Sequence, residues 1–97
     1  MKRIIILGST GSIGTQALEV VDKYPNEFEV VGLACNSKEL ILEQIAKYSP
    51  KYVAVVDRSL ANKIKVAFPA VEIFVGDEGI SRLAGIKVDL LVNGLVG

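Results

Sequence analysis

The 97-residue sequence contains no histidine and a single cysteine, Cys35. The lack of histidine removes the commonest general base, the usual catalytic triad and most transition-metal sites. One cysteine excludes an internal disulfide and a thiolate zinc site, so we interpret Cys35 as a buried structural thiol, with a reactive thiol as the alternative. We therefore expect no catalytic residue and no metal ligand in this chain.

Long apolar runs and an excess of charge of one sign are also missing. Apolar residues make up 51% of the chain, yet no run approaches the roughly 18 residues that a membrane span needs. The apolar patch at residues 4–7 is too short for the core of a signal peptide. Eleven basic and eleven acidic residues cancel, which leaves no basic field for nucleic acid or anionic lipid. We therefore expect a cytoplasmic protein without nucleic-acid or membrane partners.

Two kinds of apolar segment alternate along the chain. Short runs rich in β-branched residues predict strands that are buried on both faces of a parallel sheet. Apolar stripes at three- and four-residue spacing lie between these runs and predict helices with one face on the sheet. This alternation predicts a doubly wound, Rossmann-like α/β fold with right-handed crossovers. The predicted strands are residues 3–7, 28–35, 52–56, 71–75 and 88–96.

Prolines and polar residues mark the predicted helix ends. The first helix covers residues 12–23 and should end at "YPNE", residues 24–27, because proline cannot continue a helix. Side chains suited to capping lie near the predicted starts of the next three helices, at Ser37, Ser59 and Asp77.

No linker, repeat or low-complexity segment divides the chain, so residues 1–97 predict one domain. The last residue, Gly97, directly follows the fifth apolar run, and no helix follows to cover that part of the sheet. Apolar surface would then stay exposed. We therefore expect the N-terminal part of a longer protein, interrupted within this domain.

Three glycines, Gly8, Gly11 and Gly14, lie where the first predicted strand meets the first helix. Gly8 would close the tight turn, Gly11 would let the backbone approach a ligand, and Gly14 would let the helix lie near the strand. The helix N-terminus offers unpaired N–H groups and partial positive charge, which suit a pyrophosphate. The alternative is an ordinary turn that binds nothing. The flanking strand and helix favour nucleotide binding, with the hydroxyls of Ser9, Thr10 and Ser12 as further donors.

The end of the second predicted strand bears on which cofactor is bound. NAD sites usually place Asp or Glu there to bind the ribose 2′-hydroxyl. Here the strand is followed by Asn36, Ser37 and Lys38, which would accept a 2′-phosphate. The alternative is that Ser37 only caps a helix and Lys38 is only a solvated charge. Both roles can coexist at a helix N-terminus, so we favour NADP.

Other polar residues carry weaker signals. Asn93-Gly94 lies near the end of the fifth predicted strand, where it either borders the cofactor or forms an ordinary turn. The carboxylates are scattered and form no evident acid–base pair or metal cluster, so we interpret each as solvated surface. They include Glu19, Asp22, Asp57, Asp77 and Glu78.

Four segments resemble the start of the 1-deoxy-D-xylulose-5-phosphate reductoisomerase family: "ILGSTGSIGTQALEVV", "FEVVGLACNS", "YSPKYVAVVD" and "VDLLVNGLVG". The similarity covers essentially the whole chain, and the match at residues 8–14 is highly specific. The resemblance implies an NADPH-dependent homodimer that rearranges and reduces 1-deoxy-D-xylulose 5-phosphate to 2-C-methyl-D-erythritol 4-phosphate, in non-mevalonate isoprenoid biosynthesis. It also implies a divalent cation (Mg, Mn or Co) and inhibition by fosmidomycin.

The resemblance assigns site residues by position. The family's cofactor turn falls on Thr10, Gly11, Ser12 and Ile13, after Gly8. A second segment, commonly Gly-basic-Asn, falls on Asn36, Ser37 and Lys38. Asn36 replaces the glycine and Lys38 replaces the asparagine, and an alignment shifted by one residue is the alternative.

The family's Asn-Lys-Glu segment, metal-binding carboxylates, substrate-phosphate site and lid lie downstream of these residues. The chain by itself should therefore hold half a cofactor site and be inactive. Two other functions fit the same features. One is another Rossmann oxidoreductase that resembles a semialdehyde dehydrogenase, and the other is a nucleotide-sensing module without chemistry.

Overall fold

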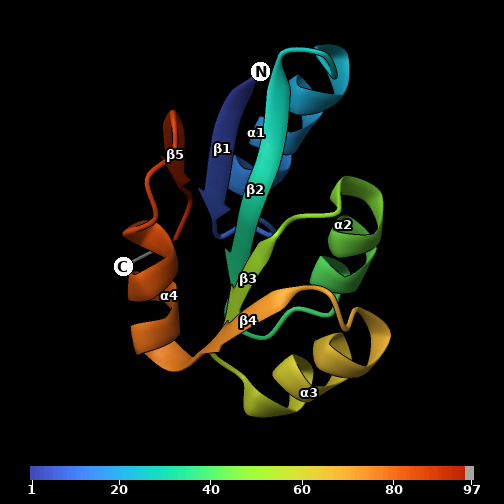
Figure 1. Cartoon of the computed structure of the whole chain (residues 1–97), viewed down its shortest axis with the longest axis vertical. Coiled ribbons are helices and arrows are strands. Elements are labelled where there is room, and N and C mark those ends of the chain that lie inside the picture. The colour runs from blue at the N-terminus through green and yellow to red at the C-terminus, as the bar shows by residue number, and fades with distance from the viewer. Residues whose placement is uncertain (96–97) are drawn as a thin grey trace.

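The computed structural model describes residues 1–95 of the chain. Five parallel strands form one sheet in the order β4-β3-β2-β1-β5 (Figure 1). The strands are β1 (Lys2–Leu7), β2 (Phe28–Cys35), β3 (Tyr52–Val55), β4 (Glu72–Val75) and β5 (Leu90–Asn93). The connecting helices are α1 (Ser12–Lys23), α2 (Leu40–Tyr48), α3 (Arg58–Ala67) and α4 (Gly76–Ala84). This confirms the Rossmann-like α/β fold.

The strand order reverses at β1. From β1 the chain moves outward through β2 and β3 to β4, then returns to place β5 on the other side of β1. In open parallel sheets, ligands bind outside the carboxyl ends of the strands where the order reverses. The glycine turn follows β1, so the topology places it at that point.

Helices cover both faces of the sheet. Because side chains alternate along a strand, Ile4 and Ile6 of β1 pack with α1, α2 and α3, while Ile5 and Leu7 pack on the side of α4. Figure 1 shows the same division, with α4 apart from the other three helices. Apolar and polar residues do not alternate along the central strands, because both faces of these strands are buried.

The predicted ends of the helices are partly confirmed. Helix α1 spans residues 12–23, as predicted, and the N–H of Tyr24 closes its last turn on the carbonyls of Val20 and Val21. Strand β5, predicted as residues 88–96, is shorter and ends at Asn93. Residue 96 of that prediction lies outside the described part of the chain.

All three predicted capping residues are wrong. Helix α2 begins at Leu40 after Glu39, its N-cap, and no side chain, that of Ser37 included, caps it with a hydrogen bond. Helix α3 is capped by Asp57, whose carboxylate accepts from the Leu60 N–H at 3.1 Å, so Ser59 is already helical. Helix α4 starts directly after β4, which places Asp77 in its first turn. At α3 and α4 the chain passes from strand to helix with fewer loop residues than we assumed.

The outer strand β5 leaves apolar side chains open to solvent. Leu90 is 39% exposed and Leu91 48%, at the end of the sheet where we expected uncovered apolar surface. Within residues 1–95, no helix combines the length and the apolar character needed to cross a membrane.

Candidate functional site

The glycine turn is fastened to the carboxyl end of β2. The N–H groups of Gly8 and Ser9 both donate to the carbonyl of Ala34, at 2.8 and 2.9 Å. The Gly11 N–H then donates back to the Gly8 carbonyl at 3.1 Å, which closes the turn just before α1. The backbone leaves β1, turns tightly and enters the helix within four residues, Gly8 to Gly11.

Gly8 and Gly14 are required by the fold itself. Gly8 has φ of +74°, which L side chains rarely adopt, and a Cβ there would lie 2.7 Å from the carbonyl carbon of Gly94. A Cβ on Gly14 would collide with the Gly8 carbonyl oxygen and lie 2.6 Å from Cα of Ser9. The predicted packing roles of both glycines are therefore confirmed.

Gly11 is different, because the protein leaves room around it. Its φ is an ordinary −84°. A Cβ there would come no closer than 3.6 Å to any protein atom outside its immediate neighbours, the nearest being the Gly8 carbonyl oxygen. The residue is also exposed. The fold thus accepts a side chain at Gly11, and only a closely approaching ligand would require glycine.

The N-terminus of α1 is open to an anion. Gly11 is its N-cap, no side chain caps it, and its first turn contains no acidic residue. The N–H groups of the first helical residues, from Ser12 to Gly14, have no carbonyl partner within the helix. Ser12 and Ile13 are exposed. The positive partial charge and the free N–H groups at the start of α1 are therefore open to solvent beyond the carboxyl end of β1, where the strand order reverses.

Ser9 does not join these donors. Its side chain is fully buried, and its hydroxyl donates to Oε1 of Gln44 at 2.7 Å. Nε2 of Gln44 donates in return to the Ser9 carbonyl at 2.9 Å. We missed Gln44 in the sequence. Its position three residues after Ile41 and directly before Ile45, on the apolar face of α2, was the available signal.

The predicted 2′-phosphate residues form an exposed tip beyond β2. Asn36, Ser37 and Lys38 are all exposed. The Asn36 carbonyl accepts from the N–H groups of Val56 and Asp57, at 3.1 and 3.0 Å, which holds the tip against the end of β3. The tip is thus fixed by its backbone, and its side chains are free to meet a ligand.

Cys35 is the last residue of β2, directly before the tip. Its thiol is buried and donates to the Lys38 carbonyl at 3.7 Å. Burial raises the pKa of this thiol, and the contacts with the Lys38 backbone and, less strongly, with the Thr10 side chain oppose the rise in part. The interpretation of Cys35 as a buried structural thiol is confirmed. Because the glycine turn is bound to the carbonyl of Ala34, two residues before Asn36, the structure brings together the two sets of predicted cofactor residues.

A hollow of about 540 Å³ lies beside the tip. The carboxylates of Asp57 and Asp77 line it. They follow β3 and β4, which end at the same edge of the sheet as β2, so carboxylates lie near the tip although none follows β2 directly in the sequence. Arg58 supplies a positive charge, and the Asp57 carboxylate is engaged by the Leu60 N–H. The lining residues are Asn36, Ser37, Val56, Asp57, Arg58 and Asp77.

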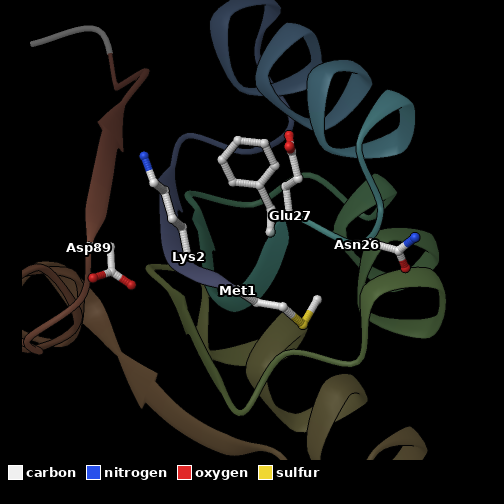
Figure 2. Close-up of a pocket in the computed structure, with 6 residues that line it drawn as sticks. Met1, Lys2, Asn26, Glu27 and Asp89 are labelled. Atoms are coloured by element: carbon white, nitrogen blue, oxygen red, sulfur yellow. The ribbon is translucent and has the colours of Figure 1, made fainter.

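A second hollow, of about 500 Å³, lies at the opposite edge of the sheet (Figure 2). It is lined by Met1, Lys2, Asn26, Glu27, Phe28 and Asp89. These residues surround the amino ends of β1, β2 and β5, away from the glycine turn. Figure 2 shows that the polar ends of Lys2, Asn26 and Glu27 point in different directions. Nothing converges there to hold a ligand.

Asn93 and Gly94 form a turn that borders the glycine turn. The Asn93 side chain accepts from the Leu95 N–H at 3.1 Å, and the Gly94 N–H donates to the Leu7 carbonyl at 2.7 Å. Gly94 also packs against Gly8. The turn is confirmed, and a contact between Asn93 and cofactor stays a prediction.

A divalent cation does not fit the described residues. Across residues 1–95, no three His, Cys, Asp or Glu side chains gather closely enough to hold a metal ion.

The Asp22 carboxylate, on the surface, accepts hydrogen bonds from the Tyr48 hydroxyl at 2.7 Å and from Lys47 at 3.0 Å. These two contacts lower the pKa of Asp22, the tyrosine contact more strongly.

The fold and the glycine turn define the class: a Rossmann-like α/β domain with an open helix N-terminus at the reversal of strand order. Comparison with known families gives the particular assignment. The model of the 1-deoxy-D-xylulose 5-phosphate reductoisomerase family matches residues 4–97, so the chain belongs to that family. The resemblance seen in the sequence is confirmed.

Individual proteins similar to this chain are also reductoisomerases. The reductoisomerase of Thermodesulfovibrio yellowstonii is 46% identical over 99 aligned residues, which cover all of this chain and 26% of the relative. A crystal structure of DOX-P reductoisomerase in complex with NADPH, fosmidomycin and magnesium matches with a TM-score of 0.90 and 28% identity, over 100% of this chain and 25% of that one. The enzyme from Zymomonas mobilis in complex with NADPH shares the fold, with a TM-score of 0.90. This chain spans about a quarter of the length of the curated relatives it matches.

Proposed function

We propose that this chain is the NADPH-binding part of a 1-deoxy-D-xylulose-5-phosphate reductoisomerase. The observation that carries the proposal is the glycine turn at the reversal of strand order, with room at Gly11 and an uncapped α1 behind it. Family membership and the solved relative that binds NADPH support the same cofactor.

In this proposal the cofactor contacts two groups of residues. The diphosphate lies against Thr10, Gly11, Ser12 and Ile13, where Ser12 and Ile13 are exposed at the start of α1, and Gly8 shapes the turn. The 2′-phosphate lies at Asn36, Ser37 and Lys38, with Lys38 as the cation. The exposure of the tip and the two hydrogen bonds from the glycine turn to Ala34, at the end of β2, support this arrangement.

The proposed enzyme rearranges 1-deoxy-D-xylulose 5-phosphate and reduces the product with NADPH to 2-C-methyl-D-erythritol 4-phosphate. We place its substrate-phosphate site, catalytic residues and divalent cation in the part of the family's length that this chain does not span. The proposal includes a cytoplasmic homodimer. The family match favours a reductoisomerase over a semialdehyde dehydrogenase-like enzyme and over a nucleotide-sensing module.

Cofactor titration tests the proposal. Fluorescence of bound nicotinamide would be followed while NADPH and NADH are added separately to the protein. We expect NADPH to bind more tightly, because Lys38 would pair with the 2′-phosphate. Tighter binding of NADH would refute the choice of cofactor, and binding of neither would refute the site.

A further inference from the structure

Only two polar side chains are buried within residues 1–95, Ser9 at 0% and Gln44 at 7% exposure. They are 35 positions apart, and they bind each other. The Ser9 hydroxyl donates to Gln44 Oε1 at 2.7 Å, and Gln44 Nε2 donates to the Ser9 carbonyl at 2.9 Å. The Ser9 hydroxyl and carbonyl and both ends of the Gln44 amide therefore each have a hydrogen-bond partner.

Packing of α2 does not explain a glutamine at this position. Its neighbours on the inner face, Ile41 and Ile45, are apolar and almost fully buried. A leucine at position 44 could fill similar space without burying an amide, and burying a polar group is unfavourable unless it is hydrogen-bonded. The glutamine instead meets a specific need of Ser9, whose carbonyl would otherwise be buried without a partner.

Gln44 completes the fixation of Ser9. The Ser9 N–H is bound to Ala34 of β2, while its carbonyl and hydroxyl are both bound to Gln44 of α2. The next residue, Thr10, begins the group proposed to contact the diphosphate. A turn that is already ordered loses less conformational freedom when its ligand binds, and so binds more tightly.

We propose that Gln44 is a positioning residue: through its two hydrogen bonds to Ser9 it holds residues 10–13 in the conformation that binds the cofactor diphosphate. The inference rests on the proposed function. Gln44 is buried behind the turn and acts through Ser9 without touching the cofactor.

The first test replaces the amide by an apolar side chain of similar size. Gln44→Leu leaves the Ser9 carbonyl and hydroxyl unpaired, so we expect the Kd for NADP⁺ to rise about tenfold. Calorimetric titration would be done well below the melting temperature of the variant. Gln16→Leu is the matched control, because Gln16 is exposed on α1, and its Kd should equal that of the wild type. A purely structural role would lower the melting temperature of Gln44→Leu and leave the Kd unchanged.

The second test uses Gln44→Glu, whose pairing with Ser9 depends on its protonation. A protonated carboxyl group has one donor and one acceptor, so it can make both bonds to Ser9, whereas a carboxylate cannot donate. Burial raises the pKa of such a carboxyl group. We expect the Kd for NADP⁺, divided by the wild-type value at the same pH, to be near one at about pH 5 and to rise about tenfold by about pH 8. The division cancels titration of the 2′-phosphate itself.

The outcomes separate this inference from the proposed function. If the wild type binds NADP⁺ and the ratio for Gln44→Glu does not change with pH, Gln44 does not position the turn, although the cofactor site stands. An unchanged Kd in folded Gln44→Leu leads to the same conclusion. If the wild type binds neither NADP⁺ nor NADPH, the proposed function fails and this inference fails with it. Should Gln44→Leu not fold, the pH series of Gln44→Glu decides.

Discussion

At the scale of single residues, the glycines of the turn meet two separable requirements. Gly14 touches backbone atoms of Gly8 and Ser9 so closely that no Cβ fits. Gly11 has room for one. Folding therefore selects glycine at position 14, and cofactor binding alone would select it at position 11.

This difference predicts opposite effects for two alanine substitutions. Gly14→Ala should lower the free energy of unfolding by about 2–3 kcal/mol, because the backbone must shift to admit the methyl group. Gly11→Ala should change it by less than about 1 kcal/mol, the range of a helix N-cap substitution. The same Gly11→Ala should weaken NADPH binding at least tenfold, because its methyl group would stand where the diphosphate approaches. Urea unfolding and cofactor titration of both variants make the comparison. Normal NADPH affinity in Gly11→Ala would mean that the diphosphate lies elsewhere.

At the scale of helices and strands, the capping of α3 shows what the sequence left open. Aspartate and serine both cap helices well, and residues 57–59 read Asp-Arg-Ser. Which of the two residues caps α3 depends on where the chain leaves β3, because the cap must be the last residue before helical backbone. The Asn36 carbonyl binds the N–H groups of Val56 and Asp57 and so fixes that point. Such a contact with a residue far away in the sequence cannot be read from local sequence.

The capping assignment predicts unequal effects of two neighbouring substitutions. Asp57→Ala removes the acceptor of the Leu60 N–H and should lower the free energy of unfolding by about 1 kcal/mol. Ser59→Ala lies within the exposed first turn of α3 and should change it by less than about 0.5 kcal/mol. Chemical denaturation measures both. A larger loss from Ser59→Ala would contradict the assignment.

The contact between the ends of α1 and α2 predicts a small dependence of stability on pH. Tyr48 and Lys47 of α2 lower the pKa of Asp22 in the folded protein. A carboxyl group with a lowered pKa stabilises the fold above its unfolded pKa of about 4, and this contribution is lost as the pH falls through the folded pKa. Asp22→Asn should therefore destabilise the protein at pH 7 by less than about 1 kcal/mol, because the site is open to solvent. Unfolding from about pH 7 down to about pH 2 should show the difference shrinking on the acid side. A difference that grows on acidification would contradict this account.

At the scale of the whole molecule, the fold and the glycine turn could be predicted because their signals are local. Buried strands such as "RIIIL" and the glycines at residues 8, 11 and 14 carry their information in adjacent residues. The Ser9–Gln44 pair and the hollow beside Asn36 could not be predicted, because they join residues from different strands and helices. The hollow also places Asp77 and Arg58 beside the tip, so charges of both signs face the proposed 2′-phosphate site.

The last prediction concerns the 97-residue chain as an isolated molecule. Mixed with 1-deoxy-D-xylulose 5-phosphate, NADPH and Mn²⁺, it should oxidise no NADPH above the rate without protein. Within residues 1–95 no metal-binding cluster is present, and the chain spans only 26% of a relative that carries the family name. Absorbance at the reduced-nicotinamide band follows the reaction, and a complete reductoisomerase of the family serves as the positive control. Cofactor titration of the same sample distinguishes a folded, inactive cofactor site from an unfolded chain. Measurable oxidation that requires both substrate and metal would show that these residues hold a catalytic site that the structure does not reveal.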